Sequence, residues 1–266
     1  MKIVTLIENL VKTGGLYAEH GLAIYLEAGN RKILFDTGQT GAFIYNAPKL
    51  KVDVEDIDVL VLSHGHYDHC GGLYAFLEKN RKARVYAKQG LFTPKYHGQY
   101  RFIGIPERED LLRDRLFYID SVTEIADDVY IMPEIKILNS EDTHFENLFI
   151  KQDGRFIQDQ FAEELYLVAP HQGMINIITA CSHRGITNIG EAATNYFDLP
   201  VNLILGGSHS QDCTPEQYRF QLDYFRRLNP KLLGVSHCTG VEKYADLKRD
   251  LGSMVFYNYT GNFIEI

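Results

Sequence analysis

The chain has 266 residues, of which 45% are hydrophobic, and it carries a formal net charge of −8. This length fits one large α/β domain or two small ones, and the apolar content is sufficient for a sizeable core. The acidic balance argues against a general nucleic-acid surface, which needs a basic stripe, although it leaves room for a local basic pocket.

The first part of the chain alternates short apolar runs with turns. Strands are predicted over residues 2–8, 22–28 and 31–35, and the Gly29-Asn30 pair between the last two indicates a tight hairpin turn. A helix is predicted over residues 41–50. These elements lead toward the segment that carries the strongest chemical signal.

That segment is His64-Gly65-His66-Tyr67-Asp68-His69, which places three imidazoles and one carboxylate within six residues. The β-branched apolar run over residues 57–62 predicts a buried strand before it, and a helix is expected from Leu73 to about Asn80. Neutral imidazole and carboxylate groups are ligands that zinc, iron and manganese accept. We expect a loop containing Gly65 to aim all four side chains at one point. The alternative, a polar turn rich in histidine, fits this strand-then-helix context less well.

The next segment is the least regular part of the chain. Residues 84–87 predict a strand, and residues 88–115 then hold scattered Gly and Pro with aromatic residues between them. We interpret residues 88–115 as an insertion, which is either a lid over the site or a solvated connection.

The second half repeats an order of strand, ligand-bearing loop and helix. Strands are predicted over residues 165–169, 174–180, 201–205, 231–235 and 253–257. Helices are predicted over residues 187–197, with Thr187 or Asn188 near the cap, over 215–228, with Thr214 as N-cap, and over 241–250.

Four predicted strands end shortly before a histidine, namely His64, His183, His209 and His237. Sites in α/β sheets gather at the carboxyl ends of strands, so these four loops predict a metal centre. The other histidines in loops, His97, His144 and His171, are expected to be solvated.

The four cysteines are Cys70, Cys181, Cys213 and Cys238, and no Cys-x-x-Cys pair is present. Three of them lie within two residues of a candidate ligand, where a disulfide would compete with the site. We therefore expect thiols in a reducing compartment. The N-terminal run has no signal-peptide pattern, and no run approaches the ~20 apolar residues of a membrane span. These features predict a cytoplasmic protein with no membrane partner.

The motifs together resemble the metallo-β-lactamase superfamily, whose signature is His-x-His-x-Asp-His after an apolar strand. Phe35-Asp36-Thr37-Gly38 resembles its early Asp turn. Within the superfamily, the chain is similar to the 7,8-dihydropterin-6-methyl-4-(β-D-ribofuranosyl)aminobenzene-5′-phosphate synthase-like proteins. The elements that carry this similarity are Cys181-Ser182-His183, Gly206-Gly207-Ser208-His209 and Ser236-His237-Cys238-Thr239-Gly240. The resemblance implies an αββα sandwich, two mixed sheets flanked by helices, as a single domain over residues 1–266. The residues alone predict only a mixed α/β protein.

The resemblance also implies a ligand set for one or two divalent transition metals. It assigns His64 and His66 to one metal, and Asp68, His69 and His237 to a second. His183 is expected to complete the first site. Zinc is the first choice, with iron and manganese as alternatives, because His/Asp sites discriminate weakly among these metals. The bridging carboxylate of many relatives is not evident, and Cys181 or Ser182 occupies the corresponding turn.

Five further residues are candidates for supporting roles. Asp36 is expected to accept a hydrogen bond from a ligand imidazole, with a plain turn residue as the alternative. Cys181 is expected to lie behind the ligands. Arg184 suits an anionic substrate group or a surface salt bridge, and His209 either lines the pocket or belongs only to a glycine turn. His20 either touches substrate or satisfies a buried turn.

Asp159, Glu163 and Glu164 form an acidic run before the strand at residues 165–169. A carboxylate from this run could take the place of the missing bridge. A solvated acidic run is the preferred interpretation.

The predicted function is a metal-dependent hydrolase or transferase, with a metal-activated water or metal-polarised phosphate, acting on a small phosphorylated and possibly dihydropterin-like molecule. Asp68 is the candidate catalytic group, which would orient or deprotonate the water. A nuclease is the first alternative, and the net charge counts against it. A non-catalytic metal-binding or redox module is the second. No nucleic-acid partner is expected, and the oligomeric state is left open.

Overall fold

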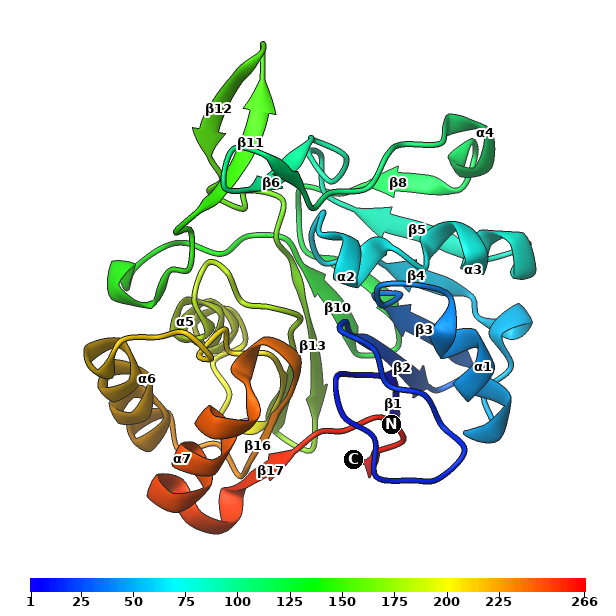
Figure 1. The fold of residues 1–266 in the computed structure, drawn as a ribbon. Coiled ribbons are helices and arrows are strands. Elements are labelled where there is room, and N and C mark those ends of the chain that lie inside the picture. The colour runs from blue at the N-terminus through cyan, green and yellow to red at the C-terminus, as the bar shows by residue number, and fades with distance from the viewer. The chain divides into compact units, whose positions relative to one another are not determined.

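The computed structural model describes residues 1–266 and divides the chain into two compact units (Figure 1). The first unit comprises Met1–Asp120, Phe145–Glu163 and Tyr259–Ile266, and the second comprises Ser121–His144 and Glu164–Asn258. Each unit has its own sheet, helices and core, and each is described by itself. The single domain expected from the resemblance stays a prediction.

The first unit contains a seven-stranded mixed sheet in the order β18-β1-β2-β3-β4-β5-β8. Neighbouring strands are antiparallel from β18 to β3 and parallel from β3 to β8. The strands are β1 (Lys2–Ile7), β2 (Ala23–Ala28), β3 (Arg31–Phe35), β4 (Val59–Val61), β5 (Arg84–Ala87), β8 (Leu116–Tyr118) and β18 (Phe263–Glu265). The helical segments are α1 (Ala42–Lys49), η1 (Val54–Asp56), α2 (Tyr67–Cys70), α3 (Leu73–Lys79) and α4 (Glu109–Leu112). The strands, turn and helices predicted up to Asn80 are confirmed.

Residues 88–115 are more regular than predicted. They contain β6 (Lys95–His97) and β7 (Arg101–Phe102), which join β11 (Leu148–Gln152) and β12 (Arg155–Gln158) in an antiparallel sheet of order β12-β11-β6-β7. Figure 1 shows the β11–β12 hairpin at the top of the view. The sequence could not show β6, because its partner β11 lies far along the chain. The lid function remains a prediction.

The second unit contains another seven-stranded mixed sheet, in the order β17-β16-β15-β14-β13-β10-β9. Its four strands β14 to β17 are parallel, and the remaining pairs are antiparallel. The strands are β9 (Thr123–Ala126), β10 (Val129–Met132), β13 (Tyr166–His171), β14 (Met174–Ile178), β15 (Val201–Gly206), β16 (Leu232–Val235) and β17 (Val255–Tyr257). The helical segments are η2 (Ser140–Asp142), α5 (Ile186–Phe197), α6 (Pro215–Leu228), η3 (His237–Thr239), α7 (Val241–Leu251) and η4 (Gly252–Met254).

Each unit buries one main apolar core between its sheet and its helices. In the first unit Phe43 of α1 and Phe76 of α3 pack with Leu60 of β4. In the second, Ile189 of α5 and Phe225 of α6 pack with strand residues such as Ile177. Burial of this kind contributes about 25 cal/mol per Å² of apolar surface, so the amphipathic helices are held mainly by their buried faces. No helix is long and apolar enough to cross a membrane.

Helices α6 and α5 both begin where they are predicted, but their N-termini are capped in different ways. The Thr214 hydroxyl accepts a hydrogen bond from the Gln217 amide in a capping box, and Pro215 occupies the first turn. The N-cap of α5 is Gly185, which has no side chain, and Thr187 and Asn188 lie in the first turn, near the cap as predicted. The buried carboxylate of Asp142 supplies the cap instead, because its Oδ2 atom accepts from the Thr187 amide at 2.8 Å.

Replacing Asp142 with alanine is expected to lower the free energy of unfolding by roughly 1–3 kcal/mol. The change removes the α5 cap and also the acceptor, 2.7 Å away, of the buried Gln221 amide group. Urea denaturation measures the effect. The exposed Asp127 offers a matched control, for which Asp127→Ala should stay within about 0.5 kcal/mol of the parent. Equal stability of the two variants would contradict the capping role.

Candidate metal centre

The His-rich motif follows β4 in the first unit, but only its first half is a loop. His66 is the N-cap of the one-turn helix α2, with extended backbone angles of φ −83° and ψ 146°. The amides of His69 and Cys70 both donate to the His66 carbonyl oxygen. The expectation that all four ligand side chains sit on a loop is therefore wrong for Asp68 and His69. A single helical turn after an extended residue is enough to bring them beside the loop histidines.

Gly65 is required by the close approach of another segment. A Cβ atom built on Gly65 would lie 2.1 Å from the Leu91 carbonyl oxygen and 2.8 Å from Lys95 Cε. No L side chain fits that space. The glycine therefore lets the backbone of the His-rich motif pass directly against residues 91–95 of the same unit.

The first unit brings its three motif histidines into contact. The ring centroid of His64 lies 4.8 Å from that of His66 and 4.4 Å from that of His69. All three rings are buried, and burial, reinforced by the neighbouring His69 and His66, lowers the pKa of His64 well below its usual value. The ring is therefore held neutral, which is the form that binds a metal.

Asp68 lies at the edge of this cluster, and His20 is beside it. The Oδ2 atom of Asp68 is 3.9 Å from His69 Nε2 and 3.3 Å from His20 Nε2. The side chain of His20 is 55% exposed, so the interpretation of His20 as the filler of a buried turn does not hold. The pair therefore joins an exposed imidazole to a largely buried carboxylate.

Asp36 lies at the end of β3 with its side chain wholly buried. Its Oδ2 atom is 2.7 Å from His69 Nδ1, the imidazole contact expected from the sequence. Its backbone has φ 60°, a left-handed conformation that is uncommon outside glycine. The turn interpretation and the imidazole contact are thus both compatible with the structure.

The second unit places three candidate residues at the carboxyl edge of its parallel strands. His183 follows β14, His209 follows β15, and His237 follows β16 and begins η3. The donor atoms of Cys181, His183 and His209 lie within 4.8 Å of one another, and the rings of His183 and His209 are 4.4 Å apart. His209 therefore belongs to a cluster of donors rather than to an isolated glycine turn.

The turn after β14 holds a thiol and a hydroxyl, those of Cys181 and Ser182. The Ser182 hydroxyl has a structural role, because it donates to the Gly207 carbonyl oxygen at 2.7 Å. Cys181 is buried against His183 and His209. Cys181 is thus the side chain of this turn that lies among the candidate donors.

His144 is a site residue that the sequence did not reveal. It is buried rather than solvated, its ring stacks on His209 with centroids 4.9 Å apart, and its amide donates to the His183 carbonyl oxygen. The prediction was wrong because His144 follows no apolar strand and matches no motif. The only local indication that His144 has a fixed position is its closeness in sequence to Asp142, which caps α5. His97 and His171 are exposed, as predicted.

The acidic run at residues 159–164 is buried, which corrects the interpretation of a solvated run. Asp159 and Glu163 both pair with Lys95, at 2.5 Å and 2.6 Å from its Nζ atom. In the second unit Glu164 accepts hydrogen bonds from the amides of His183 and Arg184. Asp159 and Glu163 therefore pair with a buried cation. Glu164 fixes the backbone of the turn that carries His183.

Arg184 lies partly buried beside His183. Its Nε atom donates to the Ile135 carbonyl oxygen at 3.0 Å, which fixes the plane of the guanidinium group. This contact holds the guanidinium against the chain of its own unit.

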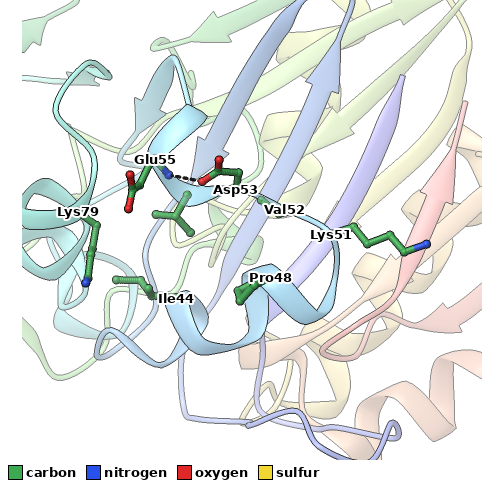
Figure 2. Close-up of a pocket in the computed structure, with 8 residues that line it drawn as sticks. Ile44, Pro48, Lys51, Val52, Asp53, Glu55 and Lys79 are labelled. Carbon is green, nitrogen blue, oxygen red and sulfur yellow. Dashed lines mark hydrogen bonds between the residues drawn. The ribbon is translucent and has the colours of Figure 1, made fainter.

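Two surface cavities lie elsewhere and contain no predicted site residue. Figure 2 shows the larger, of about 450 Å³, which is lined by Ile44, Pro48, Lys51, Val52, Asp53, Val54, Glu55 and Lys79. Of the two carboxylates there, Glu55 lies in η1 and Asp53 caps η1 by accepting from the Glu55 amide. The other cavity, of about 330 Å³, lies in the second unit beside Met132 and Tyr196. Neither is lined by a histidine or a cysteine.

The donor set fits a divalent transition metal. Buried imidazoles beside one carboxylate are the ligand chemistry that zinc, iron and manganese share. The buried hydrogen bond to Asp36 behind His69 is the arrangement that holds a ligand imidazole in place.

Comparison with known proteins agrees with the motif and the fold. Residues 16–143 match the family described as the metallo-beta-lactamase superfamily. Uncharacterized protein MJ0448 of Methanocaldococcus jannaschii is 31% identical over 254 residues, which are 94% of each chain. The 7,8-dihydropterin-6-methyl-4-(beta-D-ribofuranosyl)-aminobenzene-5'-phosphate synthase of the same organism is 26% identical, covering 90% of this chain and 88% of its own.

Solved structures show the same likeness. Tm1679, described as a metal-dependent hydrolase of the beta-lactamase superfamily, has a TM-score of 0.88 at 28% identity and covers 100% of this chain and 99% of its own. A diphosphatase from the PhnP family has a TM-score of 0.57 at 13% identity, covering 100% and 97%, and shows the fold alone. The predicted fold class, a metallo-β-lactamase fold with mixed sheets flanked by helices, is confirmed.

Proposed function

Since the chain belongs to the metallo-β-lactamase superfamily, we propose that it is a metal-dependent enzyme that hydrolyses or transfers a small phosphorylated molecule. The observation that carries this proposal is the buried contact among His64, His66 and His69 beside Asp68. The relative that is 26% identical is named as the synthase of a phosphate that contains a dihydropterin, and this name supports a phosphorylated substrate of that kind.

The proposed metal ligands are the six residues predicted from the sequence, namely His64, His66, Asp68, His69, His183 and His237. Zinc is the first choice of metal, with iron and manganese as alternatives, and one or two ions are proposed. When bound, such an ion lowers the pKa of water from about 15.7 to about 7 and polarises a phosphoryl oxygen.

The chain's own residues would prepare this chemistry in two ways. Burial keeps the His64 imidazole neutral, so that a ring nitrogen can donate to a metal. Asp68 is the proposed catalytic group, which would orient a water and accept its proton. His20 Nε2, 3.3 Å from Asp68 Oδ2, would hold that carboxylate in place or contact the substrate.

Arg184 and His209 are the proposed contacts to the anionic part of the substrate. A guanidinium group pairs with phosphate in a planar, bidentate way, and the Ile135 carbonyl fixes its plane here. His209 lies among the donors of the second unit, and Cys181 is proposed to lie behind the ligand His183. The net charge of −8 favours a small substrate over nucleic acid. The cytoplasmic location stays a prediction.

The metal-loaded chain is expected to turn over a small phosphate ester or diphosphate faster than structured RNA. We expect this ranking because the net charge of −8 disfavours the binding of a polyanion. The Arg184 guanidinium is the proposed contact to the anionic group of a small substrate. A panel of phosphomonoesters, phosphodiesters, diphosphates, lactones and RNA, assayed at one protein concentration, measures the ranking.

The control for this panel is the chelator-treated protein, which should lose activity on every substrate and regain it with added metal. Cleavage of RNA well above every small phosphoester would favour the nuclease alternative and contradict the proposal. Stoichiometric metal without turnover of any compound would instead support a binding module.

A further inference from the structure

A serine precedes each of the four histidines at the strand ends. The pairs are Ser63-His64, Ser182-His183, Ser208-His209 and Ser236-His237. In three of these pairs the serine hydroxyl makes no hydrogen bond with the histidine that follows it. Ser182 bonds the Gly207 carbonyl, Ser208 bonds Ser210 and Thr239, and the buried Ser236 hydroxyl makes no hydrogen bond.

Ser63 differs, because its hydroxyl contacts the imidazole of the histidine that follows. Ser63 Oγ lies 2.9 Å from His64 Nδ1 and 2.7 Å from Asp36 Oδ2, and both Ser63 and Asp36 are wholly buried. The Ser63 amide also donates to Asp36 Oδ1 at 2.8 Å. The serine is therefore held on Asp36 by two hydrogen bonds while it touches a candidate metal ligand.

The number of available protons decides which atom donates in the hydrogen bonds that link Asp36, Ser63 and His64. A carboxylate can only accept, so the single hydroxyl proton of Ser63 lies toward Asp36 Oδ2. Ser63 Oγ must then accept a proton from His64 Nδ1. In the reverse arrangement, Ser63 would donate its proton to His64 Nδ1. Ser63 Oγ and Asp36 Oδ2 would then lie 2.7 Å apart with no proton between them, which is costly in a buried site. The proton on Nδ1 leaves Nε2 as the nitrogen that would ligate a metal.

The same carboxylate oxygen also serves the second histidine. Asp36 Oδ2 is 2.7 Å from His69 Nδ1, so it accepts from His69 directly and from His64 through Ser63. We propose that Ser63 is a positioning residue that extends the Asp36 carboxylate to His64, so that one buried carboxylate fixes the tautomers of two metal ligands. The role in metal binding rests on the proposed function, whereas the tautomer of His64 is a property of the metal-free chain.

The test is a nitrogen-15 NMR spectrum of the histidine side chains in metal-free protein. The parent is expected to show His64 protonated at Nδ1, Ser63→Ala to lose that preference, and Ser63→Thr to restore it. His69 is an internal control, since its bond to Asp36 does not pass through Ser63. Ser182→Ala is the matched variant, because it removes another buried serine before a histidine without touching an imidazole-bound hydroxyl.

Zinc affinity, measured by competition with a coloured chelator, gives a second readout. Ser63→Ala is expected to weaken binding about 10- to 100-fold, the usual effect of removing a hydrogen bond behind a metal ligand, and Ser63→Thr to bind like the parent. A parent His64 protonated at Nε2, or a His64 tautomer unchanged in Ser63→Ala, would overturn the proposal. Loss of the His69 signal together with that of His64 would contradict a specific role as well.

Failure of the proposed function is distinguishable from failure of this inference. A parent chain that binds no zinc would contradict the metal-dependent enzyme, while the NMR spectrum would still decide whether Ser63 sets the His64 tautomer.

Discussion

Replacing His66 and His69 together with alanine is expected to remove most of the bound metal. Both rings are buried against His64, and no other side chain of the motif can take their place. Loss of a hydrogen bond behind a metal ligand costs about 10–100-fold in affinity, so loss of two ligands should cost more than about 100-fold. Elemental analysis and chelator competition on the purified variant measure the effect.

The matched control is the double variant His97→Ala/His171→Ala, which removes two exposed histidines. It should keep the metal content of the parent. Circular dichroism checks that the His66→Ala/His69→Ala variant is folded, since Asp36 loses one donor when His69 is removed. Metal content unaffected by the loss of His66 and His69 would exclude the motif as the metal site.

The second large effect is expected at Lys95, whose buried ammonium group pairs with two buried carboxylates. Its Nζ atom lies 2.5 Å from Asp159 Oδ2 and 2.6 Å from Glu163 Oε1, and its side chain is 1% exposed. Burial alone would lower the pKa of Lys95, but Glu163 and Asp159 outweigh it and the net shift is upward. Lys95→Met leaves the two carboxylates without their cation and should destabilise the chain by about 3–5 kcal/mol.

The pH dependence of this variant has a definite sign. In the parent, the carboxylates of Glu163 and Asp159 raise the pKa of Lys95, so the folded chain holds the Lys95 proton more tightly than the unfolded chain does. The stability advantage of the parent over Lys95→Met should therefore be fully present at pH 7 and decline as the pH rises above 10.5. Urea denaturation at several pH values measures the difference.

Two further variants sharpen this test. Lys95→Met/Asp159→Asn/Glu163→Gln carries no buried charge in the cluster and should recover part of the lost stability. Lys79→Met removes an exposed lysine and should change the stability by no more than about 0.5 kcal/mol. A Lys95→Met chain as stable as the Lys79→Met chain at pH 7 would show that the ion cluster contributes nothing.

Lys95 also connects stability to the candidate metal centre. Its Nζ atom lies 5.0 Å from the centre of the Phe161 ring, and that ring meets His66 edge-on at 5.2 Å. The Phe161 amide donates to Asp159 in the same cluster. The buried ion cluster therefore contacts His66 through the Phe161 ring.

The sequence predicted the elements whose signals are local. Apolar runs marked β4, β14, β15 and β16, and Thr214 with Pro215 marked the start of α6. The motif after β4 identified the candidate ligands, because residue type and spacing within six positions carry that information.

The elements that were missed depend on partners far along the chain. The strand β6 is fixed by β11, and α5 is capped by Asp142, which precedes it by some forty residues. Asp159 and Glu163 read as solvated acids because their partner, Lys95, lies 64 residues from Asp159. His144 has no motif, and only its stacking on His209 reveals it. Periodicity and local spacing cannot show such contacts.

The most direct test of the metal-dependent function is the metal content of the parent chain. Elemental analysis of protein purified without chelator, after removal of loosely bound ions, should find one or two divalent transition metals per chain, with zinc foremost. A chain that contains none, and that takes up no zinc, iron or manganese when these are supplied, would contradict the proposed metal-dependent enzyme.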